Sequence, residues 1–241
     1  MPFYTNIAVI NQSTVVSDSD GSTMTTALNL LLPQFCKDWN VGTVVAIYVA
    51  KGRNVPNSSY KIYLLDTSDV QGALGYHDII GDVPYAKVFA KTTLNYGGVV
   101  LYDPAKIRPT VAQTLSHEAF ELIVDPRCTI WWMNPNTGIL YAGETGDPVE
   151  SNTVVVNVGK VYVGLSDWIL PSWQDIQASR PYNHLNTLTH PYQVDRYGYV
   201  MTIRNGVFNY VFGSTVSDKT MEYLNDSLRS KMRNSSLTNS S

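Results

Sequence analysis

Two segments of the chain place apolar residues at helical intervals of three and four. In the first, these residues are Met24, Ala27, Leu28, Leu31 and Phe35. A helix is therefore expected to begin near Ser22. Pro33 falls inside the pattern, and an interior proline removes a backbone hydrogen bond and clashes with the preceding turn. A kink or an end of this helix is predicted near Leu32.

The second helical pattern, over residues 108–124, is the most regular in the chain. Its apolar residues are Val111, Leu115, Ala119 and Leu122. Pro109 is at a position favoured in a first helical turn, and Pro126 follows the last periodic residue. The sequence therefore predicts a helix over 108–124.

Short β-branched and aromatic runs, separated by Gly, Pro and Asn, predict strands on both sides of this helix. The runs are 7–10, 44–49, 60–65, 85–90, 98–102, 129–133, 138–141, 153–158, 160–163, 198–203 and 207–212, of which the four between 129 and 163 are strands or loops. The last two flank Arg204-Asn205-Gly206, a hairpin turn signal. Strands distributed around a central helix indicate the α+β class with a mixed sheet.

One domain is expected over residues 1–224, because neither an internal repeat nor a Gly/Ser-rich or Pro-rich linker divides them. Residues 225–241 are rich in Ser, Asn and Thr, which predicts a polar tail that is flexible or bound to a partner. The opening residues lack the basic and apolar regions of a signal peptide. No run approaches the roughly 18 apolar residues of a membrane span, so neither secretion by that route nor membrane insertion is expected.

Charge narrows the classes of partner. Among 241 residues, 17 Lys and Arg face 20 Asp and Glu, a formal net charge of -3 that disfavours general nucleic-acid binding. Charged residues make up 15%, against about 25% in typical proteins, and Ser, Thr, Asn and 16 Tyr supply polarity instead. Because solubility usually depends on charge, we expect the surface to be covered by partners in an assembly, with lineage-specific composition as the alternative.

The two cysteines, Cys36 and Cys128, are too few for a disulfide framework and lack CxxC spacing. Two buried thiols are expected, as in a chain made in a reducing compartment, and a single bridge stays open.

Candidate chemistry concentrates on the predicted helix 108–124. His117 and Glu121 are four residues apart, so they project from one helix face and can reach one metal ion, with Glu118 beside them. In the zincin motif HExxH, two His bind zinc and the intervening Glu is the general base. Here Glu121 replaces the second His, which keeps zinc as a candidate and adds Ca²⁺ and Mn²⁺. The alternative is a solvated helix face on which these residues coincide by chance.

A third ligand has several candidates. Glu144, Asp147 and Glu150 form an acidic cluster with a three-residue period, and Glu144 and Asp147 are the preferred ligands. Asp125 is a rival, because eight residues past His117 it returns to roughly the same helical face.

A family resemblance adds to this interpretation. The segments Gly-Ala-Leu-Gly-Tyr-His-Asp at 72–78, Pro-Tyr-Ala-Lys-Val-Phe at 84–89 and Ser-His-Glu-Ala-Phe-Glu at 116–121, with Asp125-Pro126, resemble uncharacterised phage and bacterial proteins with a zincin-like SHExxExxxDP helix. The acidic cluster and residues 166–173 are similar to the same family, and the likeness spans about 28–203. It implies a zincin-like domain with a metal on the helix, and a phage- or virus-associated protein located in the virion or the host cytoplasm.

The resemblance also implies roles for individual residues. In a peptidase, His117, Glu121 and either Asp147 or Glu144 would be ligands, and Glu118 would be the base. His77 or Tyr141 would stabilise the oxyanion. Residues 85–90 would form the sheet edge beside the cleft, where an extended peptide substrate pairs by strand addition.

Three function classes stay open: a zincin-like metallohydrolase, a structural virion protein that contacts other virion proteins, and a glycan- or peptide-binding module. The third rests on an aromatic surface formed by Trp131, Trp132, Trp168 and Trp173, for which core packing is the favoured alternative. His77, His184 and His190 each have a structural role as their favoured explanation. Gly97-Gly98 lacks the surrounding residues of a phosphate loop.

Overall fold

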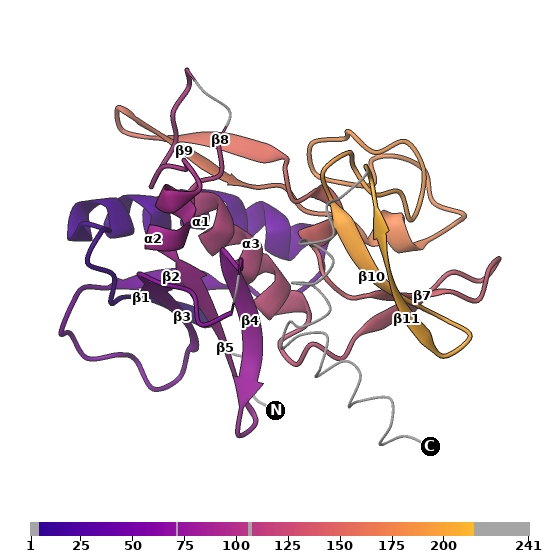
Figure 1. Cartoon of the computed structure of the whole chain (residues 1–241), viewed down its shortest axis with the longest axis horizontal. Coiled ribbons are helices and arrows are strands. Elements are labelled where there is room, and N and C mark those ends of the chain that lie inside the picture. Colours follow the sequence, from indigo (N-terminus) through magenta and orange to yellow (C-terminus); the bar gives the residue numbers. More distant parts are fainter. Residues whose placement is uncertain (1–4, 71, 106–107, 215–241) are drawn as a thin grey trace.

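A five-stranded mixed sheet forms the N-terminal half of the molecule in the computed structural model, which describes residues 5–70, 72–105 and 108–214 (Figure 1). Its strands are β1 (Asn6–Asn11), β2 (Val45–Val49), β3 (Tyr60–Leu65), β4 (Gly75–Ile80) and β5 (Val83–Phe89), in the order β2-β1-β3-β5-β4. The neighbouring pairs among β1, β2, β3 and β5 are parallel, and β4 pairs antiparallel with β5. The predicted α+β class is confirmed.

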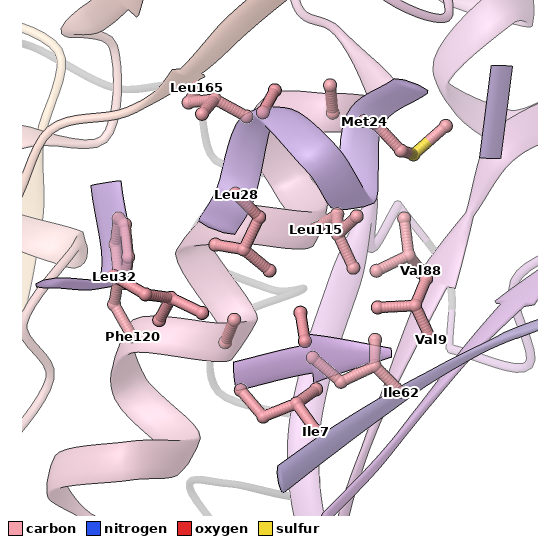
Figure 2. Close-up of a cluster of buried hydrophobic side chains, with 14 of the residues drawn as sticks. Ile7, Val9, Met24, Leu28, Leu32, Ile62, Val88, Leu115, Phe120 and Leu165 are labelled. Atoms are coloured by element: carbon pink, nitrogen blue, oxygen red, sulfur yellow. The ribbon is translucent and has the colours of Figure 1, made fainter. Parts of the chain in front are cut away.

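Two helices, α1 (Asp18–Asp38) and α3 (Val111–Val124), cover one face of this sheet. The hairpin of β8 (Thr153–Val158) and β9 (Val161–Ser166) lies over the helices, and the short helix α2 (Ala90–Asn95) follows β5 (Figure 1). Figure 2 shows the core between these layers, where Leu28 of α1 and Leu115 of α3 meet Val9, Ile62 and Val88 of the sheet. All five side chains are fully buried, and burial of each contributes about 1.5–3 kcal/mol.

A second, antiparallel sheet follows in the C-terminal half. Its strands are β6 (Trp131–Met133), β7 (Leu140–Ala142), β10 (Tyr199–Arg204) and β11 (Val207–Phe212), in the order β11-β10-β7-β6. Asn205 and Gly206 have positive φ angles of 53° and 75°, as a tight hairpin turn requires, so the predicted turn is confirmed. Two 3-10 helices, η1 (Asp147–Val149) and η2 (Pro171–Gln174), lie in the connections.

The two halves share Trp39 at the end of α1. Its indole Nε1 donates a hydrogen bond to the Ile169 carbonyl oxygen at 3.1 Å. Its ring stacks on Trp132 with the centroids 5.6 Å apart. One side chain thus joins the helical core to an aromatic cluster built around Tyr141, Trp173 and Tyr192.

The sequence predicts a kink or an end near Leu32, and the end is wrong, because α1 runs through Pro33 to Asp38. Pro33 itself is exposed, so its ring lies on the outer side of α1. The buried residues Leu32 and Phe35 on either side of Pro33 hold the helix against the core. The helix also begins earlier than expected, because the Ser17 hydroxyl accepts the Asp20 N–H and caps the first turn.

The predicted strand at 98–102 is also wrong: within it, Val99 makes a single bridge to Thr110. Two carbonyl groups of this segment accept hydrogen bonds from the start of α3 instead. Val99 O accepts from Val111 N, and Val100 O accepts from Ala112 N. These are first-turn N–H groups that a helix leaves without internal partners. Helix α3 accordingly begins at Val111, three residues later than predicted, with Thr110 as its N-cap.

The edge strands of the five-stranded sheet are β2 and β4, so the expectation that residues 85–90 form its edge is wrong. Strand β5 lies between β3 and β4. The turn at Gly81 and Asp82, both with positive φ, folds β4 back along the outer side of β5. His77 is part of this edge strand.

The aromatic-surface hypothesis fails for two of its four residues, because Trp168 and Trp173 are fully buried. Cys36 and Cys128 are buried free thiols, as predicted. Within the described residues, no helix combines the length and hydrophobicity needed to cross a bilayer. The domain limit at residue 224 and the tail at 225–241 lie outside the described part of the chain.

Candidate metal centre

Helix α3 supplies three titratable side chains to the interior. His117, Glu118 and Glu121 expose only 7%, 2% and 0% of their surfaces, which excludes the alternative of a solvated helix face. His117 Nε2 lies 3.2 Å from Glu121 Oε1, the contact that the four-residue spacing predicts. The helix thus presents a nitrogen and an oxygen donor on one buried face.

Asp147, the first residue of η1, completes a group of three donors. Its Oδ1 lies 3.2 Å from His117 Nε2. The preceding residue, Gly146, donates its backbone N–H to Glu121 Oε1 at 3.1 Å. The donor atoms of His117, Glu121 and Asp147 all lie within 4.8 Å of one another, so they can hold one metal ion.

Gly146 is required here by close approach. A Cβ atom at this position would lie 2.5 Å from His117 Nδ1, well inside van der Waals contact. The absence of a side chain lets the loop before η1 pack directly on the imidazole. This glycine escaped the sequence interpretation, although its place between Glu144 and Asp147 was a usable signal.

A second group forms around His77 of β4. His77 pairs with Ala86 in the β4–β5 ladder, and Ala86 belongs to the core beneath α3, so the imidazole points toward that helix. His77 Nδ1 lies 3.6 Å from Glu118 Oε2 and 3.5 Å from Glu121 Oε2. His77, Glu118 and Glu121 form a second set of donors that can hold a metal ion.

Glu144, a candidate ligand together with His117, lies beside His77 of this second group. Its Oε2 is 3.7 Å from His77 Nε2, and His77 Nε2 also lies 3.1 Å from the Asp125 carbonyl oxygen. Of the two preferred third ligands, Asp147 thus faces His117 and Glu144 faces His77. Glu121 is common to both groups.

Electrostatics favour positive charge in this interior. Burial by itself lowers the pKa of His117, but Glu121 and Asp147 raise it well above the usual value near 6.5. For His77, burial acts in the same direction, and Cys128 and Glu144 raise its pKa well above that value. Carboxylates that hold imidazoles in the charged form equally favour a divalent cation.

The side chain of Asp125, the rival third ligand, stabilises the turn after α3. Its two carboxylate oxygens accept the backbone N–H groups of Thr129 and Ile130, each at 2.9 Å, so Asp125 fixes the turn after α3. The loop from 125 to 130 is thereby held against His77.

Tyr141 lies in the aromatic cluster of the second sheet. Its ring centroid is 4.6 Å from that of Tyr192 and 5.8 Å from that of Trp173, and burial raises its pKa. This packing gives no support to an oxyanion role. The other two histidines are outside the centre as well: His184 stacks on Trp168 at 3.9 Å and His190 is exposed.

Comparison with protein-family models, with curated proteins and with solved structures finds no match for this chain. The class of the protein therefore follows from its own geometry. It is an α+β protein with a buried histidine and carboxylate centre between α3, β4 and η1.

Proposed function

We propose that the protein binds a divalent metal ion, zinc first among the candidates, through His117 Nε2, Glu121 Oε1 and Asp147 Oδ1. The supporting observation is that three buried donors from two distant segments converge at 3.2 Å contacts. Donors bound to one tetrahedral zinc at 2.0–2.2 Å are about 3.4 Å apart, so these donors fit the ion with small adjustments. One nitrogen and two oxygen donors also suit Mn²⁺, whereas Ca²⁺ prefers six or more oxygens.

The proposed activity is hydrolysis of a peptide substrate by a phage- or virus-associated, zincin-like enzyme, in line with the resemblance of the α3 motif. A bound zinc ion supplies Lewis acidity and lowers the pKa of a coordinated water to about 7. Gly146 N–H orients the Glu121 carboxylate, and Glu118, whose Oε2 makes no hydrogen bond to the described residues, would be the base that accepts a proton from the attacking water. Strand β4 is an edge strand of the sheet, and its end at Ile79 and Ile80, which is not buried, is where an extended peptide would pair by strand addition.

A second candidate function is a structural virion protein whose metal stabilises the fold without turnover. The burial of the centre favours it, because Glu118 exposes 2% and Glu121 none of its surface. A base that substrate does not reach cannot act, whereas a closed metal site contributes folding energy. The low fraction of charged residues, 15%, is consistent with a surface that is covered by partners in an assembly.

Elemental analysis of the purified protein tests the metal site. We expect at least about one zinc per chain in wild type and one equivalent fewer in His117→Ala with Asp147→Asn. His190→Ala, an exposed histidine outside the centre, serves as the matched control and should keep the metal. A folded wild type that stays metal-free in zinc-containing buffer would contradict the proposal.

Peptidase assays with Glu118→Gln then separate the two functions. Hydrolysis by the zinc-loaded wild type that disappears in Glu118→Gln supports the enzyme. Zinc-loaded wild type without hydrolysis of unfolded protein substrates supports the structural function.

A further inference from the structure

Glu121 has two carboxylate oxygens, and each faces a different histidine. Oε1 lies 3.2 Å from His117 Nε2, and Oε2 lies 3.5 Å from His77 Nδ1. Glu121 is fully buried, so neither oxygen is turned to solvent. A carboxylate in this position can bridge two cations.

Two atoms beside Glu121 Oε2 are within ion-pair distance of each other but make no hydrogen bond within the described part of the chain. Among the described residues, His77 Nδ1 and Glu118 Oε2 are buried side-chain atoms without a hydrogen bond. Their mutual distance of 3.6 Å is too long for a hydrogen bond. Buried polar atoms are rarely left in this state, and an absent ion is one of its standard explanations. The same distance is close to the roughly 3.4 Å between two donors on one tetrahedral zinc.

The other nitrogen of His77 fixes which atom is available for a metal. Its Nε2 lies 3.1 Å from the Asp125 carbonyl oxygen, and a carbonyl only accepts, so Nε2 carries the hydrogen and donates it. When Nδ1 is deprotonated, as a metal ligand must be, its lone pair is directed at Glu118 and Glu121. A histidine that donates one ring N–H to a backbone carbonyl and offers the other nitrogen is the usual arrangement of a metal ligand.

The position of that carbonyl is itself enforced. The Asp125 side chain accepts two backbone N–H groups of the following turn, from Thr129 and Ile130. On the opposite side, Gly75 brings β4 close to α3, since a Cβ there would lie 2.9 Å from Glu118 Oε1. The contacts of Asp125 hold His77 in place independently of any ion, and the close approach at Gly75 shows how near β4 lies to Glu118.

We propose that His77 Nδ1, Glu118 Oε2 and Glu121 Oε2 form a second divalent-cation site, so that Glu121 bridges a two-metal centre. This inference rests on the proposed function for the first metal only, because His77 and Glu118 belong to the second site alone. It changes the role of Glu118 from base to ligand. Zinc and manganese are the cations that one nitrogen and two carboxylate donors suit.

Metal counting after chelation and reloading tests the second site. Apo protein is reloaded with excess Zn²⁺, passed through a desalting column and analysed for zinc per chain. We expect two equivalents in wild type, one in Asp147→Asn, one in Glu118→Gln and one in His77→Ala. The Glu118→Gln variant keeps the side-chain shape, so it answers the question if His77→Ala fails to fold, and His190→Ala should keep both equivalents.

The outcomes separate this inference from the first site. One equivalent in wild type that survives Glu118→Gln and His77→Ala but not Asp147→Asn would overturn the second site and leave the first. One equivalent that survives Asp147→Asn but is lost in Glu118→Gln would support the His77 site and contradict the first. Two equivalents in wild type that both survive Glu118→Gln and His77→Ala would also overturn the inference.

Discussion

Gly146→Ala is the substitution by which the proposed centre can be disturbed without removal of any ligand. Gly146 has a φ of -96°, so alanine fits its backbone conformation and strain there is not at issue. The added methyl group would lie 2.5 Å from His117 Nδ1 and 2.7 Å from Cε1. Its whole effect therefore falls on the imidazole or on the loop that carries Asp147.

The size of the effect follows from these distances. Ordinary contact begins at 3.4 Å, so the ring or the loop must move by about 0.9 Å, the difference from the 2.5 Å approach. Metal sites tolerate roughly 0.2 Å of change in ligand distance. We expect zinc affinity at the first site to fall about 10- to 100-fold, the range for changes that misorient a ligating histidine. Overpacking should also cost about 1–3 kcal/mol of stability.

Competition titration of apo protein with Zn²⁺ and a chromophoric chelator measures the affinity, and urea unfolding measures the stability. Gly164→Ala is the matched control, because its methyl group would meet Tyr102 and Thr153 at 2.7 Å and 2.9 Å. It should lower stability and leave zinc affinity unchanged. Wild-type zinc affinity in a folded Gly146→Ala protein would refute the assignment of His117 as a ligand.

Three further predictions concern the bound ion, a buried hydrogen bond and a hydrogen-bonded carboxylate. Chelation should lower the melting temperature in calorimetry, because an ion that binds only the folded chain contributes about 2.7 kcal/mol at a hundredfold excess over Kd. Ser116→Ala removes the hydroxyl that accepts the buried Ser166 N–H at 2.7 Å, and should cost about 1–3 kcal/mol in urea unfolding. Burial alone would raise the pKa of Asp66, but hydrogen bonds from Ser13 and Thr14 lower it from 3.8 to about 2. The stability it contributes is therefore complete above about pH 3.8 and lost as pH falls to about 2, a loss that Asp66→Asn should reduce in pH-dependent unfolding.

Each of these expectations has a contrary result. An unchanged melting temperature in chelator and in zinc would mean that no ion stabilises the fold. Wild-type stability of Ser116→Ala would mean that the Ser166 N–H finds another acceptor. An Asp66→Asn variant with the same acid dependence as wild type would assign that dependence to other carboxylates.

Local pattern was sufficient for α3 and for its donors. The four-residue spacing of His117 and Glu121 determines their side-by-side position on any helix, and the helix itself follows from its apolar stripe. The contact of Asp147 with His117 needed more, since it depends on a turn 30 residues further along the chain. The acidic cluster of Glu144, Asp147 and Glu150 indicated the right segment, but its spacing did not show which carboxylate would contact His117.

The position of His77 beside α3 could not be predicted from residue spacing. Its approach to α3 depends on the register of the β4–β5 hairpin, in which His77 is opposite Ala86. A slip by one residue would turn the imidazole to the other face of the sheet. That register is set by the turn at Gly81 and Asp82, where positive φ angles determine how β4 folds back.

Pro33 shows the complementary error, in which a valid local rule lost to tertiary packing. An interior proline costs a helix one backbone hydrogen bond, and Pro33 is on the exposed side of α1. Leu28, Leu32 and Phe35 on the opposite side are fully buried, and their burial outweighs the missing hydrogen bond.

Anomalous diffraction at the zinc edge, from crystals of the zinc-loaded protein, tests the proposed metal centre most directly. We expect a peak about 2.0–2.2 Å from His117 Nε2, Glu121 Oε1 and Asp147 Oδ1. A second peak between His77 Nδ1, Glu118 Oε2 and Glu121 Oε2 is expected if Glu121 is a bridge. Crystals in which zinc occupies only surface positions, with His117 and Glu121 still in direct contact, would contradict the central claim that this buried cluster is a metal site.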